Sequence, residues 1–322
     1  MSPLAELLRD EIRRDGPVSF HRFMEVALYH PEHGYYRRPR DPFGKHGDFY
    51  TAEQVQPVFG ILMAARLRAL YEQMRKPEDF TIVELGAGRG EMSPAFAEWR
   101  YVPVDLAAEA MPERFRGVVF ANEFFDALPV EAVVWRNGGL HERRVAWDER
   151  FVWVTGEAAR ADVDDYVRRN LPPLAEGALC EVNLEALAWL ERIARALEVG
   201  FVFTIDYGYT RAETMRFPHG TLMSYRHHQA DEDVLADPGE RDITAHVSFT
   251  ALEEHGARLG LEKVCFENLS QTLLAAGEAD QFATALRADS HEEELRRRLQ
   301  LKNLLFGMGE TFRTLVQRRE VR

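Results

Sequence analysis

Residues 82–90 read IVELGAGRG, an apolar run that passes into three glycines at alternate positions. A buried strand followed by a glycine turn is typical of the nucleotide-binding edge of a doubly wound α/β sheet, where the backbone approaches the ligand closely. Dinucleotide folds require G-x-G-x-x-G, but Gly86, Gly88 and Gly90 form G-x-G-x-G, with Glu91 where the third glycine would stand. An acid at that position would face a pyrophosphate, so the turn favours a ligand without phosphate groups.

Glu84, at the end of the strand, favours a cationic ligand, because a carboxylate forms charge-assisted bonds with an amino group. S-adenosylmethionine carries such an amino group and a sulfonium. The motif E-x-G-x-G-x-G after a first strand therefore predicts an S-adenosylmethionine site made by Glu84, Gly86, Gly88 and Gly90. Ser93-Pro94 predicts that a helix starts just beyond the turn.

Two further strand ends carry polar residues that belong near such a ligand. Asp105 ends YVPVDL, where a ribose diol is expected, although a solvated strand end explains it equally well. NEFFDALPV (122–130) follows GVVFAN; Asn122 can bind cofactor, Glu123 and Asp126 offer carboxylates, and Phe124 and Phe125 offer apolar walls. The alternative is a helix start with two core phenylalanines.

The rest of the chain predicts the surroundings of this sheet. Residues 1–76 indicate an N-terminal helical lobe with a loop that covers the cofactor, and residues 77–322 a Rossmann-like core with two insertions. The insertions are a β-meander at 131–175 and loop and helical elements at 209–300, the latter including a solvated lid at 227–237. FVFTIDYG predicts a central strand ending in Asp206.

Composition excludes several classes of function. The chain has 322 residues, with 40 basic and 53 acidic side chains and a net charge of −13, which disfavours nucleic acid and suits a cationic partner. Two cysteines and no ordered metal-ligand spacing predict no metal site and a reducing compartment. No 18-residue apolar run or targeting pattern is found, so we expect a cytoplasmic protein that is not membrane-bound.

Several segments together resemble the MidA family of S-adenosylmethionine-dependent methyltransferases, whose mitochondrial members are similar to protein arginine methyltransferases that assist respiratory complex I assembly. The segments lie in family order: FMEVALYHPEHGYY (23–36), GDFYT (47–51), FGILMA (59–64), VELGAGRG (83–90), NEFFDALPV (122–130), IDYG (205–208), GTLMSYRHH (220–228) and DPGERDITAHVSFTAL (237–252). The resemblance implies a class I methyltransferase fold and adds Asp48, Phe49 and Thr51 to the cofactor site. TAEQ (51–54) departs from the family's TSPE, and the stretch between Arg100 and Gly117 is short.

This resemblance implies methyl transfer to a protein side chain, with a basic or arginine-containing segment as partner. An arginine acceptor is always protonated, so carboxylates must orient it; Glu123, Asp126 and Asp206 are the predicted catalytic residues. His246, near Asp242, is a candidate proton relay, or a structural histidine that fixes a loop. A small-molecule acceptor, and a binding or assembly factor that keeps the fold as a scaffold, remain alternatives.

Overall fold

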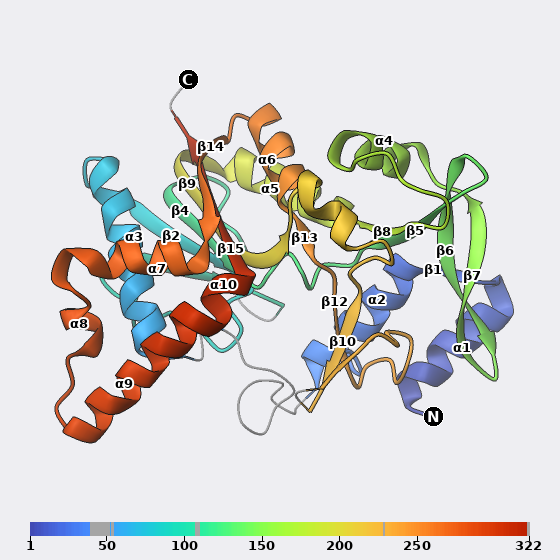
Figure 1. The fold of residues 1–322 in the computed structure, drawn as a ribbon, viewed down its shortest axis with the longest axis horizontal. Helices are drawn as coiled ribbons and strands as arrows, with labels where there is room; N and C mark the ends of the chain where they lie inside the picture. Colours follow the sequence, from blue (N-terminus) through green and yellow to red (C-terminus); the bar gives the residue numbers. More distant parts are fainter. Residues whose placement is uncertain (39–51, 53–54, 107–109, 228, 321–322) are drawn as a thin grey trace. The chain divides into compact units, whose positions relative to one another are not determined.

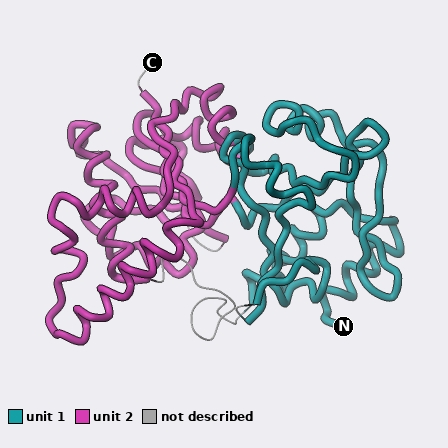
Figure 2. Tube along the Cα trace, viewed as in Figure 1, with its two compact units in different colours: residues 1–50, 126–188, 209–251 teal, residues 51–125, 189–208, 252–322 magenta. Residues whose placement is uncertain are grey.

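The computed structural model describes residues 1–38, 52, 55–106, 110–227 and 229–320. Two compact units are present (Figure 2), each made of three chain segments. The first unit comprises residues 1–50, 126–188 and 209–251, and the second comprises residues 51–125, 189–208 and 252–322. Figure 1 shows the elements of both units.

The second unit contains a mainly parallel sheet. Its strands are β2 (Phe80–Leu85), β3 (Arg100–Val104), β4 (Phe115–Asn122), β9 (Leu197–Tyr209), β14 (Glu262–Asn268) and β15 (Phe312–Arg319). They follow the order β14-β15-β9-β4-β2-β3; β3, β2, β4 and β9 are parallel, and β15 runs antiparallel to both of its neighbours. All six residues of β2 are buried, as expected for a strand with a neighbour on each side and covered faces. The predicted α/β sheet is confirmed.

Helices and helical turns complete this unit (Figure 1). They are α3 (Val58–Gln73), α7 (Leu269–Gly277), η4 (Glu278–Asp280), α8 (Ala283–Leu286), α9 (His291–Asn303), η5 (Leu304–Met308) and α10 (Gly309–Thr311). One apolar cluster joins α3 and α7 to the sheet and includes Phe59, Phe120, Phe203 and Leu273. Two of the unit boundaries fall within helices, in α5 (Leu184–Ala196) and in α6 (Phe249–Arg258).

The first unit contains an antiparallel sheet. Its strands are β1 (Val18–Ser19), β5 (Glu131–Arg136), β6 (Gly139–Asp148), β7 (Arg150–Ala158) and β8 (Leu179–Val182), in the order β1-β6-β5-β8 with β7 on β6. The predicted meander is β5, β6 and β7; the rest of the predicted range 131–175 includes helix α4 (Ala161–Asn170). A smaller sheet joins β10 (Met223–Arg226), β11 (Gln229–Asp231) and β12 (Asp242–Thr244), and β13 (Val247–Ser248) follows.

Two N-terminal helices belong to the same unit as the meander. They are α1 (Pro3–Asp15) and α2 (Phe20–Tyr29), followed by the turn η1 (Tyr35–Arg37); η3 (Arg211–Arg216) lies later in the unit. Ser2 and Ser19 cap α1 and α2 by accepting from Ala5 N and Arg22 N. Phe20 of α2 packs on Trp153 of β7, with ring centroids 4.9 Å apart. The units thus group the chain differently from the predicted division after residue 76, because α1 and α2 share a core with the inserted sheet, whereas α3 packs in the other unit.

The segment 227–237, predicted to be a solvated lid, is exposed at most of its described residues but is anchored at two apolar positions. Val234 and Leu235 are 2% and 3% exposed and belong to the core of the first unit. Arg241 Nη1 lies 2.7 Å from Asp231 Oδ2, which ties the segment to the next strand. Two apolar residues inside a charged run are therefore enough to anchor it.

Candidate active site

The glycine turn lies at the carboxyl end of β2. Gly86, Gly88 and Gly90 have φ values of +70°, +51° and +74°, a region that side chains disfavour. Gly86 N donates to Val104 O at 2.9 Å, which fixes the turn against β3. A Cβ on Gly86 would lie 3.0 Å from Phe124 Cδ2, so the turn fits closely against that ring.

The helix predicted to start at Ser93-Pro94 is not formed. Residues 91–99 form consecutive turns in which Ser93 N donates to Gly90 O and Trp99 N donates to Phe96 O. β3 begins at Arg100, and the segment before it is held by burial of Met92 and Phe96.

Asp105 reaches the glycine turn. Its Oδ2 accepts from Gly88 N at 2.8 Å, and its Oδ1 accepts from Leu106 N at 2.5 Å. Asp105 is half-buried and lies at the carboxyl edge of the sheet, where a ribose is held in related folds. The cofactor role of Asp105 stays a prediction.

Glu84 lies on β2 with its side chain completely buried. The Tyr101 hydroxyl, on the neighbouring strand β3, donates to Glu84 Oε2. A buried carboxylate requires such donors, and this bond orients it beside the turn. Tyr101 was not predicted from the sequence; the only available signal was its place on the strand expected to flank β2.

Asn122 is the last residue of β4, and Glu123 follows it directly. Glu123 has a φ of +50°, an uncommon conformation for a residue with a side chain, and its N–H donates to Ile205 O at 2.9 Å. Glu123 Oε1 accepts from Ala52 N at 3.0 Å and from Asn122 Nδ2 at 3.2 Å. Asn122 is 4% exposed, and its Oδ1 has no hydrogen-bond partner among the described residues. A buried acceptor of this kind is suited to an N–H or O–H group of a ligand.

Asp206 lies near the carboxyl end of the neighbouring strand β9 and is completely buried. The strand continues to Tyr209, three residues beyond the end that the sequence predicted. Its Oδ2 accepts from Phe125 N at 3.1 Å and its Oδ1 from Tyr207 N at 2.9 Å. The carboxylate therefore connects the end of β9 to the segment after β4. These bonds give Asp206 a positioning role.

The two phenylalanines of NEFFDALPV differ in their surroundings. Phe125 is completely buried, as the core alternative expected. Phe124 is half-buried, and its ring packs edge-on against Trp189 with centroids 5.1 Å apart. Because Phe124 also faces Gly86, it is the better candidate for a wall of the cofactor site.

The other predicted catalytic residues, Asp126 and His246, belong to the first unit. Asp126 is 5% exposed, and its carbonyl accepts from Ala245 N at 3.0 Å. His246 N donates to Thr221 Oγ1 at 3.0 Å, and its ring packs edge-on against Phe217. Burial lowers the pKa of His246, so the imidazole is neutral at pH 7.

Asp242, the suggested partner of His246, accepts a hydrogen bond from the Tyr36 hydroxyl at 2.9 Å. Burial and Asp242 raise the pKa of Tyr36 well above its ordinary value, so the phenol keeps its proton. This pairing of Asp242 with Tyr36 was not predicted. Asp48, Phe49 and Thr51 lie outside the described residues, and their cofactor role stays a prediction.

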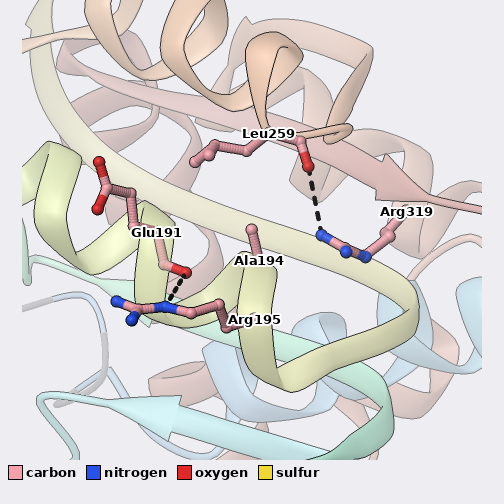
Figure 3. A pocket seen from close by; sticks show the side chains of 5 residues that line it. All are labelled: Glu191, Ala194, Arg195, Leu259 and Arg319. Atoms are coloured by element: carbon pink, nitrogen blue, oxygen red, sulfur yellow. Dashed lines mark hydrogen bonds between the residues drawn. The ribbon is translucent and has the colours of Figure 1, made fainter.

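A cavity of about 380 Å³ lies at the other edge of the sheet (Figure 3). It is lined by Glu191, Ala194, Arg195, Leu259 and Arg319. Arg319 pairs with Gly200 near the start of β9, whereas Asp206 lies toward the other end of that strand and the glycine turn follows the last residue of β2. Arg319 Nη1 donates to Leu259 O and Arg195 Nε to Glu191 O, so both arginines are engaged locally. This cavity is separate from the candidate active site.

In the part of the chain that the structure describes, no group of three or more His, Cys, Asp or Glu side chains is placed to hold a metal ion. None of the helices in that part combines the length and apolar character needed to cross a membrane.

Comparison with known proteins identifies the family. Residues 94–267 match the family described as "Putative S-adenosyl-L-methionine-dependent methyltransferase". The Drosophila melanogaster protein arginine methyltransferase NDUFAF7 homolog, mitochondrial, is 27% identical, over 76% of this chain and 68% of its own length. The Homo sapiens protein arginine methyltransferase NDUFAF7, mitochondrial, is 26% identical, over 78% of this chain and 68% of its own. The chain thus spans about two thirds of the length of these relatives.

A solved structure supports the same assignment over nearly the whole fold. A COG1565 superfamily member from Burkholderia thailandensis, bound to S-adenosylhomocysteine, is 30% identical with a TM-score of 0.89, covering 99% of this chain and 92% of that chain. A native structure of a COG1565 protein from the same organism is 29% identical with a TM-score of 0.84 and the same coverage. The glycine turn, Glu84, Asp105 and the acceptor atom of Asn122 fit a ligand with amino and hydroxyl groups. Together these findings establish that the chain belongs to the S-adenosylmethionine-dependent methyltransferase family, with the Rossmann-like fold and the cofactor of that family.

Proposed function

We propose that this methyltransferase transfers a methyl group to an arginine side chain of a protein. The proposal is supported by two relatives that are named protein arginine methyltransferases and cover about three quarters of the chain. The net charge of −13 suits a basic or arginine-containing segment as substrate and disfavours nucleic acid.

The observation that carries the proposal is the carboxylate of Glu123. Donors from Ala52 and Asn122 fix its Oε1, and the residue keeps an uncommon backbone conformation at the cofactor edge of the sheet. Such local strain is often retained where a side chain must be aimed at a ligand. A fixed carboxylate at this edge can orient a guanidinium by charge-assisted hydrogen bonds.

We assign a separate role in cofactor or acceptor binding to each of the site residues of the second unit. Glu84, Asp105, Asn122 and the glycine turn would hold S-adenosylmethionine, which supplies a methyl group on a sulfonium. Glu123 would orient the acceptor nitrogen toward that methyl group and localise the guanidinium charge away from the attacking nitrogen. Asp206 would hold the segment after β4 in place through Phe125 N. A relay role for His246 and a carboxylate role for Asp126 stay predictions.

The test is methyl transfer from labelled S-adenosylmethionine to proteins of a cell extract, followed by hydrolysis and amino-acid analysis. Methylarginine is the expected product. Glu123→Gln keeps the shape of the side chain and is expected to lower transfer at least about 100-fold while the cofactor Kd changes by less than about threefold.

Three other outcomes would contradict the proposal. Label on a different protein residue would exclude arginine, and label in a small molecule would support the small-molecule alternative. Tight cofactor binding without any transfer would support an assembly or binding factor. The cytoplasmic location stays a prediction, since the relatives are named as mitochondrial proteins.

A further inference from the structure

Helix α9 lies in the second unit (Figure 1), and its side chains differ in exposure between its two faces. Its inner face lies on the core of the unit through the half-buried Leu301, with the buried Leu304 just beyond the helix end. On the opposite face Leu295 and Leu299 are 52% and 55% exposed, and Phe306 in η5 is 71% exposed. Leucines at i and i+4 on the solvent side of a charged helix form an apolar stripe that nothing in the described unit covers.

The stripe has the spacing of a coiled-coil seam. Glu292, Leu295, Leu299 and Lys302 are separated by three, four and three residues, and Phe306 follows four residues later. Alternating steps of three and four place side chains along one line of a helix, which is the line that faces a partner helix in knobs-into-holes packing.

The seam is complementary to itself. Leu295 and Leu299 are each two residues from Arg297, and Glu292 and Lys302 are each five residues from it. In an antiparallel pair of α9 helices centred on Arg297, Leu295 would therefore face Leu299 of the other copy, and Glu292 would face Lys302. A two-fold axis requires this kind of self-complementary surface.

The charges on α9 agree with this arrangement. Glu292 and Lys302 form no ion pair with any residue that the structure describes, so both are available to another molecule. Arg296 and Arg298 flank the seam, and each is neutralised on its own helix, by Glu293 at 2.6 Å and by Glu294 at 2.6 Å. The flanking arginines therefore do not oppose the approach of a second copy.

We propose that the seam of α9, made of Glu292, Leu295, Leu299 and Lys302, is the docking surface for a second copy of this chain, in antiparallel orientation. The exposed Phe306 of η5 lies beyond the end of this seam. Two helices of this length bury less than a standard interface, so the dimer is expected to be weak. The assignment does not depend on the methyl acceptor.

The experiment is sedimentation equilibrium of the full chain between about 1 and 200 µM. The wild type is expected to pass from monomer to dimer, and the variant Leu295→Glu with Leu299→Glu is expected to weaken the dimer at least about tenfold. Glu292→Lys and Lys302→Glu are each expected to weaken it several-fold, because each places two like charges together across the seam.

The most informative measurement is on a mixture of the Glu292→Lys and Lys302→Glu variants. In the mixed pair, the lysine introduced at position 292 of one chain faces the glutamate introduced at position 302 of the other. At the opposite end of the seam, the native Lys302 of the first chain faces the native Glu292 of the second. Opposite charges therefore meet at both ends, and the mixture is expected to form a mixed dimer more tightly than either variant pairs with itself.

Two controls accompany these measurements. Circular dichroism and cofactor binding check that each variant is folded, and Leu7→Glu, at an exposed leucine of α1, is the matched control for the leucine changes. A wild type that stays monomeric, or a dimer unaffected by the two leucine changes, would overturn the proposal.

Discussion

The carboxylate of Asp105 accepts a hydrogen bond from the backbone N–H of Gly88 at 2.8 Å. The two residues are 17 positions apart, and the bond joins the end of β3 to the turn that follows β2. One acidic side chain thus shapes the glycine turn and lies where a ribose diol is expected. Removal of this side chain is expected to weaken cofactor binding, an effect that can be measured separately from any loss of stability.

Asp105→Ala is expected to weaken binding of S-adenosylmethionine and S-adenosylhomocysteine about tenfold or more, because bonds from a ligand to a charged group contribute about 1.5–3 kcal/mol. Calorimetric titration measures it. Asp148→Ala, at an exposed acid of the β6–β7 turn, is the control and should bind as the wild type does. Equal affinities for both variants would remove Asp105 from the cofactor site.

Gly86→Ala is expected to abolish cofactor binding, because the new Cβ lies at positive φ and 3.0 Å from Phe124 Cδ2. Gly138→Ala is a matched control: Gly138 has a φ of +78° with nothing within 4 Å of a Cβ. Both variants should lose about 1 kcal/mol of stability from backbone strain. Only Gly86→Ala should lose binding, and a Gly86→Ala protein with normal affinity would refute the assignment of this turn.

Asp206→Asn is expected to lower the free energy of unfolding by about 1–3 kcal/mol, because the amide has one oxygen for two buried backbone donors, those of Phe125 and Tyr207. The rate of methyl transfer should fall by more than the loss of folded protein explains, because the segment that carries Glu123 loses the hydrogen bond from Phe125 N to Asp206. Urea unfolding and initial rates measure the two effects. Asp79→Asn, an exposed acid just before β2, provides the comparison, and no difference between the two would contradict the positioning role.

The free energy of unfolding is expected to fall as the pH falls, in part because His246 becomes protonated. Burial lowers the pKa of this residue below 6.5, so the unfolded chain binds the proton more readily than the folded chain. The neutral His246 side chain therefore makes its full contribution to the free energy of unfolding above about pH 6.5. This contribution is lost as the pH falls through the pKa of His246 in the folded state.

The measurement is the difference in urea midpoint between pH 7.5 and pH 5.0, compared between wild type and His246→Gln. The variant should show a smaller difference, while the shared contribution of His255, whose pKa burial also lowers, cancels in the comparison. An unchanged difference would show that His246 does not titrate in this range.

Much of the fold could be predicted from periodicity and turn signals. The strands β2, β3, β4 and β9 are all evident in the sequence, because buried parallel strands read as short apolar runs that end on polar residues. Ser2, Pro3 and Gly16 similarly mark the two ends of α1. Glu84, Asp105 and Asn122 could be found by their place at strand ends.

The contacts between distant segments could not be predicted. The bond from Tyr101 to Glu84 depends on the register of two strands, and the bond from Tyr36 to Asp242 joins residues 206 positions apart. Burial of Val234 and Leu235 in a charged run has the same origin, since only the tertiary fold supplies their apolar neighbours. Local sequence motifs indicate which residues belong to the site, but they do not show which distant residues form hydrogen bonds with them.

The place of β15 in the sheet has a consequence for how the protein reaches its folded state. β15 follows every other strand of this sheet in chain order, yet it pairs with β9 on one side and β14 on the other. Until residues 312–319 arrive, β9 presents an open edge that carries Asp206, and such an edge can pair with another chain. Because strands more than 100 residues apart must meet, closure of this sheet is a late and slow event during folding, and the nascent enzyme is most exposed to misassembly just before it gains its last strand.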